Sequence, residues 1–202
     1  MKKAIWFSLI IVIVVGSSVA VLSYTTITHH SSQLPKTFDS ITSAKQSMKI
    51  TSSAFTDHHS IPQQYTCDGK GINPPLEFQN VPNEAKGLVL IMDDPDIPKN
   101  INPTGMYAHW VVYNMDPRVR SIPENSVPLG MQGLNSAEQQ NYTPPCPPDR
   151  QHRYFFKLYA VDTRLHFVDP AEVTKQMVID EMKGHIIAEA ELVGVYNRPQ
   201  NK

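Results

Sequence analysis

The stretch PPCPPDRQHRYFFKLYAVD, residues 144–162, joins a proline-rich loop to a predicted strand. Its second half is rich in aromatic and β-branched side chains, which is typical of a β-strand. Its first half places four prolines around Cys146, and because proline fixes the backbone φ angle the loop is stiff before the strand begins. His152 and Arg153 stand at the junction. A stiff loop can hold a pocket wall in place beside such polar side chains.

Apolar runs of strand length recur along the rest of the chain. Many of its 17 prolines lie between these runs, so the connections are predicted to be stiff turns rather than helices. Many strands and one late helix predict a mainly-β sandwich with a few small helices. The predicted strands begin at Met48 and then cover residues 88–92, 108–115, 153–162 and 188–196.

One helix is predicted over residues 171–184, directly after Asp169. Pro170 suits the first turn of a helix, and Gly184 suits its C-terminal cap. The apolar side chains expected on one face of this helix are Val173, Met177, Ile179 and Met182.

Residues 1–22 differ in kind from the rest of the chain. Two lysines precede an apolar run and then small residues, which is the order found in a secretory signal. The alternative is an uncleaved membrane anchor over residues 4–22, which is nearly long enough to span a bilayer. Residues 23–47 are polar and rich in Ser and Thr, as a linker would be. A secretory signal predicts export to the periplasm or the medium. A membrane anchor over residues 4–22 predicts that the rest of the chain is held at the membrane, outside the cytoplasm.

Charge and cysteine content narrow the function further. The formal net charge is −1 and no basic run is present, so we expect no nucleic-acid binding. Cys67 and Cys146 are the two cysteines, and in an oxidising compartment such a pair is a candidate disulfide. Two buried free thiols are the alternative.

Polar residues lie at an end of, or within, three of the predicted strands. These are the acids of DDPDIP, residues 93–98, then His109, then His152 with Arg153 and Tyr154. Taken singly, the acids fit an ordinary Asx-turn and His109 a hydrogen-bonded core residue. Taken together, imidazole N–H groups can donate to an anion while nearby carboxylates orient the rings and favour their protonated form.

The same residues carry a resemblance to a known family. DDPDIP, HWVVYNM, GLN, PPCPP, HRYFFKLYAVD and MKGHIIAEAELVGVYNR occur in the order found in the phosphatidylethanolamine-binding protein (PEBP) family. YTCDGKGINPPLEFQNVP, residues 65–82, is similar to the opening motif of the bacterial and archaeal branch. The resemblance covers residues 48–198, which we take as the PEBP-like domain.

That resemblance implies a two-sheet antiparallel β-sandwich with a small pocket for phosphate-like head groups. Tyr107 falls at the rim, where the family often has a tryptophan. Arg153 alternates to the other side of its strand from His152, so we expect it to pair structurally, with an acid. The pocket residues that the resemblance implies are Asp94, Asp96, His109, Pro147, Pro148, His152 and Tyr154.

The chain also departs from the family pattern in two loops near the pocket. The segment DRQ before His152 lacks the usual glycine, and residues 135–146 lack several small residues. Asn141 can still adopt a left-handed conformation, whereas Pro144 cannot. These replacements leave the shape of the pocket open. The residues that stand at small or glycine positions are Ala137, Glu138, Asn141, Thr143 and Pro144.

Non-enzymatic binding of phosphate-type anions or phospholipid head groups is the leading functional hypothesis. The resemblance adds regulation of kinases or inhibition of proteases, and export favours a protein target outside the cytoplasm. One alternative is a phosphohydrolase or metal-dependent enzyme that uses the same His/Asp cluster. Another is an interaction protein with a vestigial pocket. We assign no catalytic residue, metal or cofactor, and expect membrane contact only through an uncleaved N-terminal segment.

Overall fold

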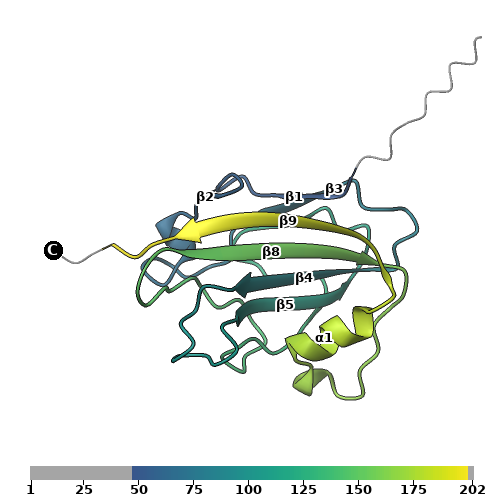
Figure 1. The fold of residues 1–202 in the computed structure, drawn as a ribbon. Coiled ribbons are helices and arrows are strands. Elements are labelled where there is room, and N and C mark those ends of the chain that lie inside the picture. The colour runs from purple at the N-terminus through teal and green to yellow at the C-terminus, as the bar shows by residue number, and fades with distance from the viewer. Residues whose placement is uncertain (1–46, 200–202) are drawn as a thin grey trace, which may run out of the picture. The chain divides into compact units, whose positions relative to one another are not determined.

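A computed structural model describes residues 47–199 of the chain (Figure 1). The predicted signal or anchor and all but the last residue of the predicted linker lie outside the described residues. Within residues 47–199, helices are too short to cross a membrane. The structure has two β-sheets, one α-helix and two short 3-10 turns, which confirms the predicted mainly-β fold with few helices.

The larger sheet has six strands in the order β2-β9-β8-β4-β5-β7. Every neighbouring pair in it is antiparallel except β2 with β9, which is parallel over two residues. The long strands lie side by side across the middle of Figure 1. The strands of this sheet are β2 (His59–Ser60), β4 (Gly87–Asp94), β5 (Tyr107–Met115), β7 (Met131–Gln132), β8 (His152–Val161) and β9 (Ile186–Tyr196).

The smaller sheet has three strands in the order β1-β3-β6, and both of its pairings are antiparallel. The predicted strand that begins at Met48 is real but short, because the extended backbone ends at Thr51. The strands of this sheet are β1 (Lys49–Thr51), β3 (Leu76–Gln79) and β6 (Ser121–Ile122), and the 3-10 turn η1 (Gln63–Tyr65) precedes β3.

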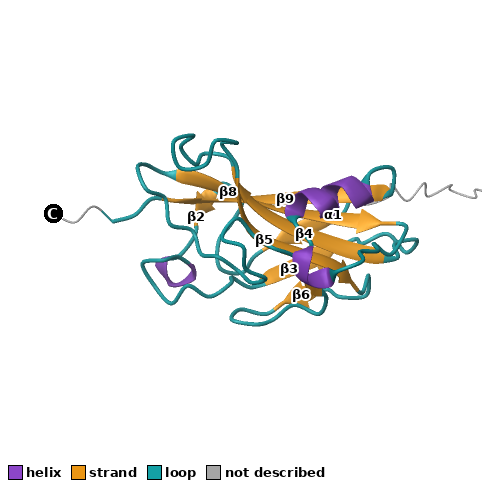
Figure 2. Cartoon of the chain, turned by 90° about the horizontal axis from the view of Figure 1, so that it is seen from below, coloured by secondary structure: helices purple, strands orange, loops and turns teal. Residues whose placement is uncertain are grey.

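Strand β4 explains the layering, because it is buried along its whole length. Leu88, Leu90 and Met92 belong to the core between the two sheets, while Val89 and Ile91 belong to a second core on the opposite face. Successive strand residues point to opposite faces, so a continuous apolar run indicates a strand covered on both sides. Figure 2 shows the helix α1 on one side of the larger sheet and strands β3 and β6 on the other.

The second core is closed by the helix and the segment before it. Helix α1 spans Lys175–Met182 and begins at Thr174, whose hydroxyl accepts a hydrogen bond from the Met177 N–H. Pro170 lies instead in a separate 3-10 turn, η2 (Pro170–Glu172), whose N-cap is Asp169. The predicted single helix over 171–184 is therefore wrong in extent.

The predicted apolar face of that helix is also wrong in part. Val178 and Met182 are the residues of α1 that are buried, whereas Met177 is exposed. Val178 and Met182 belong to the second core and Ile179 packs against it, so the buried face of α1 includes Val178 in place of Met177. Gly184 does lie just past the helix, with φ at +79°, as the predicted cap requires.

Candidate functional site

The site begins where β4 ends. Asp94 is the last residue of the strand and continues the inward-facing row of Leu88, Leu90 and Met92. Its Oδ1 accepts a hydrogen bond of 2.7 Å from the backbone N–H of Asp96, which forms the turn predicted for DDPDIP. Its Oδ2 lies 2.7 Å from Nδ1 of His152, and both side chains are buried. One carboxylate therefore shapes the turn and orients an imidazole.

His152 is the first residue of β8 and is completely buried. Its Nδ1 contacts Asp94, and its Nε2 lies 2.8 Å from Oδ1 of Asp149. The His152 hydrogen bond lowers the pKa of Asp149, so this carboxylate is ionised at neutral pH. Each of the two ring nitrogens faces a carboxylate oxygen, which is a hydrogen-bond acceptor, so both nitrogens of His152 are placed to donate. His152 is thereby assigned as an imidazolium held between two carboxylates.

His109 lies in β5 under different constraints. Its Nδ1 donates to the backbone carbonyl of Thr143 over 2.8 Å, which fixes the tautomer of the neutral ring with a lone pair on Nε2. Burial lowers the pKa of His109 to about 4, although the Thr143 carbonyl and the charge of Asp94 oppose this shift. The site therefore combines a histidine whose two ring nitrogens both face carboxylates with a histidine that is neutral at neutral pH.

Tyr154 lies between the two histidines on the inner face of β8. Its ring packs edge-on against His109, with centroids 5.2 Å apart, and lies 6.5 Å from the ring of His152. Its hydroxyl is buried and has no hydrogen-bond partner among residues 47–199. Burial and the nearby charge of Asp94 raise the pKa of Tyr154, so the hydroxyl keeps its proton. An unsatisfied buried donor is costly and favours a site that accepts a polar ligand.

The proline loop reaches this cluster through a covalent anchor. Cys67 and Cys146 form a disulfide with Cα atoms 5.4 Å apart, which confirms the predicted pairing. The N–H of Cys67 also donates to the carbonyl of Pro145. Pro147 is buried, as a pocket wall would be, whereas Pro148 is exposed. The loop is therefore fixed at one end by the disulfide and continues through Pro148 to Asp149.

Asp96, which the resemblance places in the pocket, is paired with Arg153. Arg153 donates to both of its carboxylate oxygens, from Nε over 2.8 Å and from Nη2 over 2.9 Å. This fork lowers the pKa of Asp96. The predicted pairing of Arg153 with an acid is present, and Asp96 is that acid. Its carboxylate is therefore engaged by a guanidinium, while its backbone N–H holds Asp94.

Two residues that contact the histidines are absent from the predicted set of site residues. Asp149 contacts His152 directly, and the carbonyl of Thr143 sets the tautomer of His109. The sequence carries only an indirect signal for Asp149, because it lies in the segment DRQ, residues 149–151, which lacks the glycine usual in the family. Thr143 acts through its backbone, so its residue type gives no signal. Tyr107 does lie beside the cluster, with its ring 4.8 Å from that of His109.

The loop that lacks glycines adopts its turn by another means. Glu138 has a φ of +59°, in the left-handed region that favours glycine, while the candidate Asn141 does not. Asn135 organises this loop, since its side-chain oxygen accepts from the N–H groups of Ala137 and Gln139. The glycine replacements are therefore accommodated within the loop.

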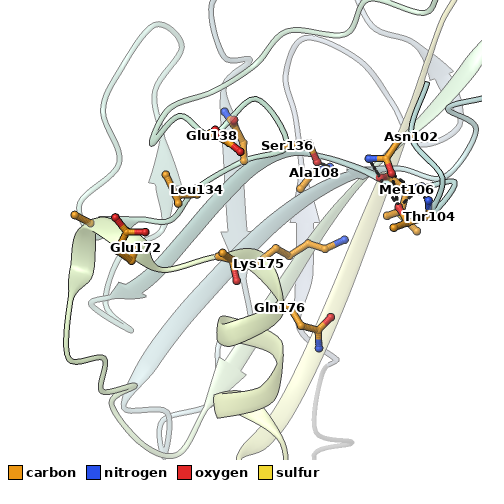
Figure 3. Close-up of a pocket in the computed structure, with 13 residues that line it drawn as sticks. Asn102, Thr104, Met106, Ala108, Leu134, Ser136, Glu138, Glu172, Lys175 and Gln176 are labelled. Atoms are coloured by element: carbon orange, nitrogen blue, oxygen red, sulfur yellow. Dashed lines mark hydrogen bonds between the residues drawn. The ribbon is translucent and has the colours of Figure 1, made fainter. Parts of the chain in front are cut away.

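A groove of about 970 Å³ is lined by other residues than the two histidines (Figure 3). In the close-up, Glu172 and Leu134 lie at one end, Asn102 and Thr104 at the other, and Lys175 between them. Lys175 Nζ already donates to Oδ1 of Asp93 over 2.8 Å. The charge of Lys175 is therefore neutralised by Asp93. For this reason the groove is a weaker candidate for anion binding than the histidine cluster.

Comparison with known proteins decides the family. The family model described as phosphatidylethanolamine-binding protein matches residues 51–197. The chain belongs to the phosphatidylethanolamine-binding protein family. The predicted resemblance is thereby confirmed, including its bacterial and archaeal branch.

Relatives of this PEBP-family chain come from both bacteria and archaea. A UPF0098 protein of Chlamydia trachomatis is 48% identical over 151 residues, covering 75% of this chain and 99% of the relative. A UPF0098 protein of Methanothermobacter thermautotrophicus is 43% identical over 157 residues, with the same coverage of 75% and 99%.

Solved structures support the fold of this family member. The PEBP homologue CT736 of Chlamydia trachomatis matches with a TM-score of 0.73 and 47% identity, covering 76% of this chain and 99% of that one. YbcL of E. coli, described as a member of the mammalian PEBP family, matches with a TM-score of 0.68 and 25% identity, covering 76% and 100%. The two-sheet sandwich is therefore the fold shared with these structures.

Proposed function

We propose that this protein binds small phosphate-type anions without catalysing a reaction, at the buried cluster of Asp94, His109, His152 and Tyr154. The observation that carries the proposal is the contact between His152 Nε2 and the Asp149 carboxylate. An oxygen of a phosphate group has the same requirements as this carboxylate oxygen, since both are anionic acceptors of a charged N–H. Membership of the PEBP family supports the choice of a phosphate-type ligand.

The remaining groups of the cluster suit an anion for separate reasons. Asp94 fixes the ring of His152 from the inner side, so that Nε2 alone is directed toward a ligand. The Tyr154 hydroxyl is a donor without a partner among the described side chains, and a phosphate oxygen would satisfy it. His109 Nε2 becomes a donor only if the ring gains a proton, because its Nδ1 is committed to Thr143.

Anion binding is therefore coupled to proton uptake in this proposal. An anion close to His109 favours the imidazolium and raises its pKa from about 4 toward neutrality. A proton taken up on binding makes affinity fall as pH rises. The PEBP resemblance also implies regulation of a protein target, which for an exported chain lies outside the cytoplasm. Ligand binding in this pocket would control that regulation.

Calorimetric titration of the full chain with inorganic phosphate and with phosphoethanolamine tests the proposal. We expect saturable binding that weakens from about pH 6 to about pH 8, as the proton required by His109 becomes scarce. The change His152→Ala removes a charged donor and should weaken binding at least tenfold, roughly the worth of one hydrogen bond to a charged group.

His185→Ala is the matched control. His185 also contacts an aspartate over 2.8 Å, through Nδ1 to Oδ1 of Asp162, but both side chains are about half exposed. Its removal should leave affinity unchanged. Absence of saturable heat in the folded wild-type protein would contradict the proposal and favour a vestigial pocket. Release of phosphate from phosphoethanolamine during the titration would instead favour a phosphohydrolase.

A further inference from the structure

The anion position of the proposed pocket is held by a side chain of the protein itself. Asp149 comes from the loop just before β8, and its side chain is 47% exposed, whereas His152 is completely buried. The contact between them therefore lies at the boundary between the cluster and solvent. Selectivity at this position depends on which anions can replace the Asp149 carboxylate as the acceptor of the His152 Nε2–H. This inference rests on the proposed function.

Charge decides what such a replacement requires. The Asp94 and Asp149 carboxylates flank one imidazolium, so these three groups carry one net negative charge. A ligand with a single charge that displaces Asp149 restores the same balance and gains no Coulomb energy. It also competes with a carboxylate tethered three residues from His152, whose effective concentration is on the order of millimolar or higher. A monoanion is therefore at a disadvantage.

Arg150 gives a more highly charged ligand a second contact. Its guanidinium is 57% exposed and approaches Oδ2 of Asp149 at 3.6 Å and Oδ1 of Asp96 at 3.9 Å. Among residues 47–199 this guanidinium makes one hydrogen bond, of 3.2 Å, to the backbone carbonyl of Asp96. This guanidinium is loosely held compared with the fork that Arg153 makes on Asp96. It can turn to a new partner at little cost.

A phosphate monoester matches these two donors. It carries about −1.5 to −2 charges at neutral pH and three acceptor oxygens, so it can accept from His152 and from Arg150 together. A phosphodiester has a single charge and two free oxygens. We infer that Asp149 is an internal competitor that reserves the pocket for phosphate monoesters and excludes phosphodiesters, the form in which phosphate occurs in a phospholipid head group.

Methyl phosphate and dimethyl phosphate are the probes, because they differ by one methyl group and by charge. Both are titrated by calorimetry near pH 7.5, where the monoester is mostly dianionic. The wild-type chain should bind methyl phosphate at least about tenfold more tightly than dimethyl phosphate, since a monoanion gains no Coulomb energy when it replaces the Asp149 carboxylate, whereas the monoester brings additional charge that also reaches Arg150. In Asp149→Ala both probes should bind more tightly and the ratio between them should fall severalfold.

The control is Asp162→Ala, which removes a half-exposed aspartate that holds a histidine over the same 2.8 Å, at His185. It should change neither affinity. Unchanged affinities and an unchanged ratio in Asp149→Ala, with binding still lost in His152→Ala, would overturn the inference and leave the proposed function standing. Binding by Asp149→Ala alone would overturn the selection of monoesters, because Asp149 would then exclude both probes. No binding of methyl phosphate by either protein would overturn the proposed function itself.

Discussion

Asp93 and Asp94 are neighbours in β4, yet they belong to two different regions of the molecule. Asp93 faces the outer side of the larger sheet, where Lys175 of α1 donates to it over 2.8 Å and Lys157 lies 3.7 Å away. Asp94 faces the inner side and holds His152 over 2.7 Å. Both carboxylates are buried and both contact a cation at nearly the same distance.

The two regions differ in whether the cation contacts a second carboxylate. Both lysines contact the Asp93 carboxylate, and Lys175 belongs to helix α1. The contact between Asp93 and Lys175 therefore ties the helix to the sheet. His152 has a second nitrogen that continues to a partly exposed carboxylate at the surface. A pair that closes on itself is structural, whereas a pair with an exchangeable outer partner can serve as a binding site. Strand alternation separates the two roles by one residue.

We expect the largest difference between the two regions when each carboxylate is removed in turn and the free energy of unfolding is measured. Asp94→Ala leaves His152 as a fully buried charge without its inner partner, and should lower the free energy of unfolding by about 3 to 5 kcal/mol. Asp93→Ala leaves two lysines that are 20% and 31% exposed and can reach water, so the loss should be about 1 kcal/mol. Urea denaturation monitored by tryptophan fluorescence gives both values. Equal losses would contradict the separation of roles.

The two histidines sharpen the comparison through pH. Burial lowers the pKa of His109 to about 4, so between that value and the ordinary value of about 6.5 the unfolded chain binds a proton that the folded chain does not. The contribution of His109 to stability is therefore complete above about pH 6.5. It falls by about 1.4 kcal/mol per pH unit as the pH decreases to about 4, a total of roughly 3 kcal/mol.

Urea denaturation between about pH 7 and pH 4 measures this slope, and His109→Gln should flatten it by removing the titrating group. Two salt-bridged carboxylates of the site region fall outside this window. Asp96 and Asp149 have lowered pKa values, so the stability that they contribute is lost only below their ordinary pKa of about 3.9. An equal slope in the wild-type and His109→Gln proteins would contradict the assignment of a buried neutral histidine.

The sequence was informative wherever a residue's position follows from the strand it lies on. Apolar runs predicted β4, β5, β8 and β9, and strand alternation predicted that Arg153 would face away from His152 toward an acid. The disulfide remained one of two alternatives, because bridging requires two distant loops to meet. Helix α1 was mispredicted in extent because it begins after the Thr174 cap, whereas Pro170 lies in the separate turn η2.

The contact between Asp149 and His152 could not be predicted, because it depends on the path of a loop. Residues 147–151 have no repeating geometry, and Asp149 is one of three acids near His152 once the chain folds. The missing glycine in this loop signalled a difference from the family pattern. It did not show that a carboxylate of this loop lies at the position proposed for the ligand.

Nitrogen NMR of the His152 ring tests the central claim most directly. In the full-length protein near neutral pH, both ring nitrogens should carry protons, because both donate to carboxylates. Addition of methyl phosphate should shift the Nε2–H resonance, whose partner is exchanged, and leave Nδ1–H nearly unchanged against Asp94. A His152 ring with one bare nitrogen, or an Nε2–H resonance that methyl phosphate does not move, would contradict the account.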